Sequence, residues 1–157
     1  MNDDKENGPE LEKESLKDAM RNVIEEARVI IPGIQALFGF QTMAVFNNRF
    51  DDLPSEIKAA YLVALGLLVV AIGLLMTPAA YHRLAEPGQV SRTMINRSST
   101  LITAGLVPLM FALAIDVHVV VVAAIDNNAI GFGAAAATFL FLAGLWFGFP
   151  LSQRRRR

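Results

Sequence analysis

The most apolar part of the chain contains very few side chains that could do chemistry. Between residues 98 and 150 the only acidic, basic or imidazole groups are those of Asp116, His118 and Asp126. Hydrolytic catalysis would require Asp116, His118 and a serine to converge. On one helix, however, residues 116 and 118 point about 160° apart, because each residue turns the helix by about 100°. The spacing therefore argues against a catalytic pair.

A glycine-rich stretch, GFGAAA at 131–136, matches the G-x-G-x-x-A pattern of dinucleotide-binding proteins. That pattern needs a preceding strand and an acidic residue about 20 positions further on, and this stretch opens an apolar run without either. The sequence has no Walker glycine loop and no H-E-x-x-H motif, and the absence of cysteine excludes disulfides and thiolate metal sites. We therefore expect no enzymatic activity, no cofactor and no metal site.

Polar residues inside the first apolar stretch form a pattern of their own. The stretch EEARVIIPGIQALFGFQTMAVF begins at Glu25, and on a helix its Arg28, Gln35 and Thr42 fall within about 40° of one another. Gln41 points about 120° away from Gln35. Because a lipid-facing amide would be unsatisfied, we expect this stripe to face other helices, with Arg28 paired to Glu25. Either a structural network or the mouth of an ion or ligand path would explain it.

Asp116 lies within the third apolar stretch, where a carboxylate is costly unless it is paired, hydrated or protonated. We expect it to face the bundle or a subunit interface, either as a hydrated acid or as a proton carrier. His118 is expected to be an interfacial packing residue. The polar candidates within the membrane are Glu25, Arg28, Gln35, Thr42, Asp116 and His118.

Four apolar stretches determine the fold class. The chain has 157 residues, of which 54% are hydrophobic and 18% charged, and this is too apolar for an ordinary water-soluble domain. A hydrocarbon core of roughly 30 Å needs about 20 apolar residues of helix, and continuous runs favour helices over barrel strands. We expect an all-α membrane protein, an up-down bundle of four helices in contact with the lipid bilayer. The predicted spans are 29–46, 59–76, 101–125 and 130–151, with DNNA at 126–129 as a tight hairpin.

Basic residues predict the orientation. Twelve of the fourteen Lys and Arg residues flank the spans on one side, and only Arg49 and Lys58 fall on the other. The positive-inside rule then places both termini in the cytoplasm, in a multi-pass protein of the inner membrane. The net charge of −1 gives no sign of a nucleic-acid partner. The RRRR tail at 154–157 is expected to be a topological anchor, with binding to lipid headgroups or to a partner as the alternative.

The region before the first span is predicted to form a cytoplasmic amphipathic helix over 9–28, after a disordered tail at 1–8. Its apolar residues recur at helical spacing and are Leu16, Met20, Val23, Ala27 and Ile30. We expect the helix to continue into the first span, and a helix lying on the membrane surface is the alternative. The membrane domain then covers 29–151, and 152–157 form a basic tail.

Small residues recur along the second and fourth predicted spans. Such stripes let helix backbones approach closely. Packing within the bundle and contact between subunits both explain them. The residues are Gly66, Gly73, Gly133, Ala137, Gly144 and Gly148.

Three motifs carry a resemblance to a known family. EARVIIPGIQALFGFQ in the first span, TPAAYHRL after the second and ALAIDVHVV in the third resemble a bacterial family of small four-span membrane proteins classed as a domain of unknown function. The resemblance covers the chain from about Glu25 to Leu151. It implies a four-span inner-membrane protein and supplies no established activity. Some members carry an automatically transferred sodium:proton antiporter label, although this chain lacks the repeated broken helices that build a midplane transport site.

Two function classes remain. The first is a structural or interaction protein whose cytoplasmic helix engages a membrane-protein partner or a second copy. The second is an oligomeric ion or proton pathway lined by intramembrane polar groups, similar to a sodium:proton antiporter. Low polarity inside the spans favours the first class. Purified protein in liposomes distinguishes the two, because only a pathway dissipates an imposed proton or sodium gradient.

Overall fold

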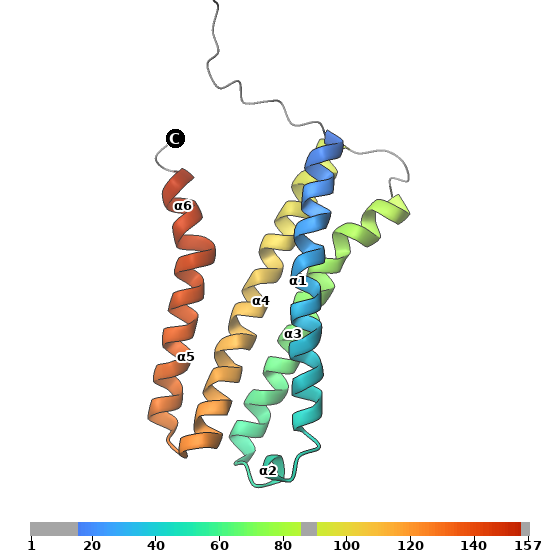
Figure 1. The fold of residues 1–157 in the computed structure, drawn as a ribbon. Coiled ribbons are helices and arrows are strands. Elements are labelled where there is room, and N and C mark those ends of the chain that lie inside the picture. Colours follow the sequence, from blue (N-terminus) through green and yellow to red (C-terminus); the bar gives the residue numbers. More distant parts are fainter. Residues whose placement is uncertain (1–15, 86–90, 155–157) are drawn as a thin grey trace, which may run out of the picture.

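The computed structural model describes residues 16–85 and 91–154, and every element in these ranges is a helix. The long helices α1, α3 and α4, and a continuous rod made of α5, η1 and α6, run along the length of the bundle (Figure 1). The short α2 lies in the connection between α1 and α3. The elements are α1 (Leu16–Ala44), α2 (Asn48–Asp51), α3 (Ser55–Ala85), α4 (Arg92–Ile125), α5 (Asn128–Ala143), the π-helical η1 (Gly144–Gly148) and α6 (Phe149–Arg154).

Three of the described helical runs are long and apolar enough to cross a membrane, and they indicate a multi-pass membrane protein. They are Ser55–Tyr81, Arg92–Ile125 and Asn128–Gln153, and they contain the second, third and fourth predicted spans. The first predicted span, 29–46, is helical as far as Ala44 but is not among the three. Because α1 ends at Ala44, an 18-residue window within it reaches back to Arg28, and this arginine, Gln35 and Gln41 lower the mean hydropathy of the window.

The core is built around α4, which packs against α3, α5 and α1. The larger apolar cluster joins side chains of three helices, α1, α3 and α4. Trp146 of η1 packs against the same cluster from the fourth rod. The buried members are Ala27, Ile34, Leu68, Ala71, Leu75, Ile102, Leu109 and Ala112.

The first helix is continuous from Leu16 through Pro32 to Ala44. The predicted amphipathic helix therefore continues into the first apolar stretch without a break in the helix. Its apolar face is directed toward the bundle, because Met20 and Ala27 are buried and Ile30 packs against the core. The predicted disordered tail at 1–8, the helix start at 9–15 and the last three arginines lie outside the described residues.

The predicted hairpin between α4 and α5 is confirmed. Asp126 adopts the left-handed conformation (φ 55°), and its N–H donates to the carbonyl of Val122. Asn127 then caps α5, because its side-chain oxygen accepts from the N–H of Ile130 at 3.1 Å. This hairpin and α2 lie at one end of the bundle, which we call the hairpin end, and the start of α1 and the end of α6 lie at the other (Figure 1).

The predicted small-residue stripes do not pack inside this chain. A Cβ atom added at Gly66, Gly73, Gly133 or Gly144 would meet nothing within 4 Å, and one at Gly148 would meet only the carbonyl of Ala143 in its own rod. Ala137 is exposed as well. The prediction of packing within the bundle was therefore wrong for these residues. Those of the fourth rod face outward because that rod contacts the bundle along one side only, with 6% of its apolar window buried; Gly66 and Gly73 lie on the exposed side of α3.

Close helix contact occurs instead at two other glycines. At Gly131 of α5 an added Cβ would lie 2.6 Å from a methyl of Val122 and 2.8 Å from Nδ1 of His118. At Gly105 of α4 it would lie 3.0 Å from Leu75. These two positions, rather than the predicted stripes, let α4 approach its neighbours.

Candidate functional site

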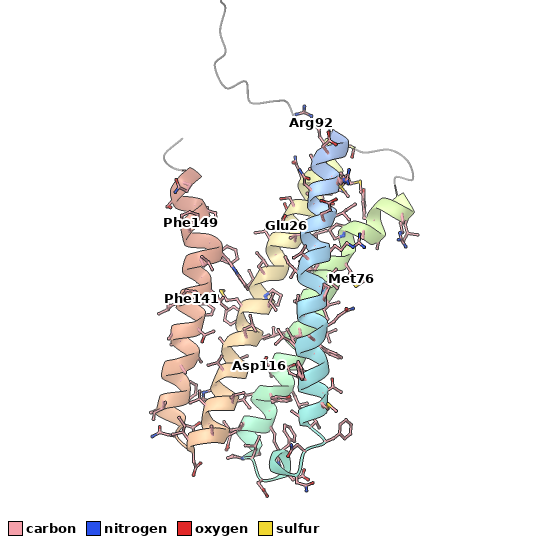
Figure 2. The ribbon with its side chains drawn as sticks, viewed as in Figure 1. Glu26, Met76, Arg92, Asp116, Phe141 and Phe149 are labelled. Carbon is pink, nitrogen blue, oxygen red and sulfur yellow. The ribbon has the colours of Figure 1, made fainter. Side chains whose placement is uncertain are left out.

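A hydrogen bond between α1 and α4 forms the centre of the candidate site. Nε2 of Gln41 donates to Oδ1 of Asp116, from a position 75 residues earlier in the chain. Gln41 is 6% exposed, and Asp116 is half-buried. Figure 2 shows Asp116 in the part of α4 nearer the hairpin end. The expectation that Asp116 faces the bundle agrees with this contact.

Tyr61 adds the third helix to the site. Its hydroxyl donates to the backbone carbonyl of Gln41 at 2.7 Å. That carbonyl lies in the last turn of α1, where helical acceptors lack an intrahelical donor. Tyr61 is 7% exposed, and its ring meets the ring of Phe50 edge-on at 5.4 Å. Gln41, Tyr61 and Asp116, which we call the polar cluster, therefore connect α1, α3 and α4.

One acceptor of the polar cluster has no partner. Oε1 of Gln41 is buried and receives no hydrogen bond from any residue that the structure describes. An amide oxygen normally accepts when it is buried, because leaving it unpaired costs free energy. With the carboxylate of Asp116 beside it, this oxygen offers the kind of acceptor pair that suits a proton, a water or a hard cation.

A cavity of about 630 Å³ reaches the polar cluster from the hairpin end. Its lining includes Tyr61 of the polar cluster and the acids Asp52 and Asp126, but not Gln41 or Asp116. Two carboxylates at the edge of a low-dielectric region attract cations. Away from the hairpin end the core is apolar, with Ile34 and Leu75 at 2% and 1% exposure. Polar lining is therefore present on one side of the cluster only.

His118 is separate from this cluster. It is 7% exposed, and its ring lies 4.3 Å from that of Phe132 in α5, so it packs between α4 and α5 as expected. Its Nδ1 is buried without a hydrogen bond among the described residues. A second cavity, of about 450 Å³, lies beside it and is also lined by Glu56 and Asn128. Asp116 and His118 thus contact different helices and do not form a catalytic pair.

The predicted stripe on α1 does not face the bundle. Gln35 and Arg28 are exposed, and Thr42 donates to the carbonyl of Phe38 in its own helix at 2.9 Å. Glu25 bonds Arg21 at 3.0 Å instead of Arg28. No ion pair to Arg28 is found among the described residues. The predicted Arg28–Glu25 pair and the predicted inward stripe were both wrong.

The buried face of α1 explains this outcome. Its fully buried residues recur every seven positions and are Met20, Ala27, Ile34 and Gln41. Seven residues are almost two helical turns, so these side chains share one face. The apolar side chains of Met20, Ala27 and Ile34 favour burial of that face. Gln41 is buried with them because it follows at the same spacing. This repeat was the signal in the sequence that identifies Gln41 as the inward-facing glutamine.

Comparison with known proteins gives one match. Residues 9–150 match the model of a family of unknown function, DUF6328. This confirms the predicted membership of a family that has no assigned activity. A search of the curated proteins and a search of the solved structures find no match to the chain.

Proposed function

The chain belongs to a family of unknown function, DUF6328, and from its geometry we propose that it is a four-span membrane protein with a structural or interaction role. The fourth span in this proposal is α1. Ile34 of α1 shares a core cluster with Leu68, which is the central residue of the candidate span Ser55–Tyr81. A helix packed at that level lies within the hydrocarbon region if α3 crosses it.

The protein is proposed to lie in the inner membrane, and its basic residues support an orientation with both termini in the cytoplasm. The start of α1 and the end of α6 lie at the same end of the bundle (Figure 1). Arg21, Arg83 and Arg92 belong to helix segments near that end, whereas Lys58 belongs to the hairpin end. The positive-inside rule assigns the end with more basic residues to the cytoplasm.

The exposed amide of Gln35 is the observation that supports an interaction role. Gln35 follows Ile34, which is 2% exposed and part of the core, so it lies at the level of the apolar helices but points outward. An amide without hydrogen-bond partners in an apolar medium costs roughly 2–7 kcal/mol. A hydrogen bond between Gln35 and a polar group of another chain would remove this free-energy cost.

Cross-linking from position 35 tests this role. Gln35→Cys, labelled with a photoreactive maleimide in native membranes, should give a discrete adduct with protein. Ala36→Cys, also exposed but about 100° around the helix, should give much less. Adducts with lipid alone at both positions would refute the interaction role.

The proposed orientation is tested by thiol labelling in the same membranes. Asn128→Cys should react with an impermeant external thiol reagent and Gln153→Cys should not; the reverse pattern contradicts the orientation.

The polar cluster supports a second candidate function, a proton or cation pathway of the antiporter type. Asp116 bonds Gln41, whose Oε1 is unpaired among the described residues, and Tyr61 of the same cluster lines a cavity that also holds the acids Asp52 and Asp126. The apolar core beyond the cluster means that a complete route would need further subunits or a different conformation. If the protein in liposomes dissipates a proton or sodium gradient, Asp116→Asn should abolish the flux, and Asp52→Asn should only reduce it. Absence of flux in the unsubstituted protein excludes this candidate.

A further inference from the structure

We infer that the outward face of α1 binds a second copy of this chain through paired Gln35 side chains; this inference rests on the proposed interaction role and names its partner. The face consists of residues that lie about one and two helical turns apart. Relative to Gln35, Thr42 lies about 20° to one side and Gly39 about 40° to the other. All three are exposed, and we call them the outer stripe.

The depth of Gln35 is what requires a protein partner. Its neighbour Ile34 belongs to the cluster that also contains Leu68 and Leu109, and these lie at the middles of the candidate spans Ser55–Tyr81 and Arg92–Ile125. Water cannot supply hydrogen bonds there. A glutamine side chain is too short to reach a headgroup across half of a hydrocarbon core of roughly 30 Å. Its hydrogen-bond partner must therefore be another polar group at the same depth.

A second copy meets this requirement by symmetry. Two copies inserted in the same direction place their Gln35 side chains at equal depth, and a twofold axis along the membrane normal brings the same face of each α1 together. An amide carries both a donor and an acceptor, so two related Gln35 side chains can pair with each other. A different protein would need a polar residue placed independently at that level.

Gly39 makes the close approach feasible. It lies one turn from Gln35 on the same stripe, and an added Cβ there would meet nothing within 4 Å of this chain. Small residues beside a polar residue are typical of helix contacts in membranes. Thr42 already bonds its own helix at 2.9 Å and so adds no unpaired group. Arg28, two turns from Gln35, repeats near the axis, and its long side chain can extend to the water boundary, where salt screens the like charges of the two copies.

Disulfide cross-linking of the purified chain, reconstituted alone at low protein-to-lipid ratio, tests the inference. The natural chain contains no cysteine, so each single-cysteine variant reports one position. Gln35→Cys and Thr42→Cys should form disulfide-linked dimers under mild oxidation. Ala36→Cys and Met43→Cys, each one residue away and exposed, are matched controls and should not. Thr42→Cys keeps the Gln35 amide intact, so it reports the interface even if the first variant weakens it.

Affinity gives a second readout. In a fluorescence-transfer assay of dimerisation, Gln35→Leu should raise the dissociation constant about 3- to 30-fold, and Gln35→Asn should recover part of the loss. Equal cross-linking at the stripe and control positions, or none at either stripe position, would overturn the inference. If photo-cross-linking in native membranes still finds another protein at position 35, the interaction role stands and only the second copy is excluded. If neither experiment finds a protein at position 35, both the interaction role and the inference of a second copy are refuted.

Discussion

Gly131→Ala should destabilise the α4–α5 pair far more than the same change two residues later, at Gly133. The added methyl at 131 would lie 2.6 Å from a methyl of Val122 and 2.8 Å from Nδ1 of His118. Val122 is β-branched and 5% exposed, so its side chain has little freedom to move aside. Overpacking of this kind costs about 1–3 kcal/mol, whereas the higher helix propensity of alanine returns about 1 kcal/mol or less.

Gly133→Ala is the matched control, because it adds the same methyl to the same helix where nothing lies within 4 Å. The propensity gain is common to both variants, so the difference between them isolates the clash. We expect a difference of about 1–3 kcal/mol in the free energy of unfolding in detergent, with Gly133→Ala at or above the stability of the unsubstituted protein. Equal stability of the two variants would show that α5 does not approach α4 at Gly131.

Gln41→Leu should give the largest loss among substitutions in the polar cluster. The leucine leaves the half-buried carboxylate of Asp116 without its donor, and an unpaired buried polar group costs about 1–3 kcal/mol. Gln35→Leu makes the same chemical change on the same helix at an exposed position. At a protein concentration low enough to keep the chain monomeric in detergent, that control should leave the free energy of unfolding within about 0.5 kcal/mol of the value for the unsubstituted protein.

The double variant Gln41→Leu with Asp116→Leu separates pairing from packing. Replacing both partners of a hydrogen bond by apolar groups is often nearly neutral, so the double variant should be more stable than Gln41→Leu alone. A coupling energy of about 0.5–3 kcal/mol is expected for residues in contact. Simple additivity of the two single changes would mean that the Gln41–Asp116 bond makes no net contribution to stability.

The helices and the hairpin could be predicted because their signals are local. Long apolar runs correspond to α3, α4 and the α5–η1–α6 rod, and the DNNA turn corresponds to the left-handed Asp126 and the capping Asn127. Each of these features depends on neighbours within a few residues. A family match over residues 9–150 adds no activity to them.

The direction that each helix faces was harder to predict. An apolar side chain is compatible with lipid and with protein alike, so hydrophobicity did not tell whether Gly133 or Gly131 lies against α4. On α1 the polar residues Arg28, Gln35 and Thr42 predict one inward face, and the apolar repeat that ends in Gln41 predicts another. The repeat decides the outcome, because each buried apolar side chain contributes to packing in the core and an exposed amide can still be paired by another chain.

The unbroken length of α1 has a mechanical consequence. Its 29 residues give a rod of about 44 Å at 1.5 Å per residue, which exceeds a hydrocarbon core of roughly 30 Å. In the proposed four-span arrangement, about one third of the rod extends outside the hydrocarbon at the Met20 end. No loop interrupts it between Met20 and Gln35, but Pro32 lies between them and cannot donate a hydrogen bond to the carbonyl of Arg28, so the rod can bend there. In the proposed four-span arrangement, a movement of the projecting end in water is therefore taken up partly by bending at Pro32, and only the remainder reaches Gln35.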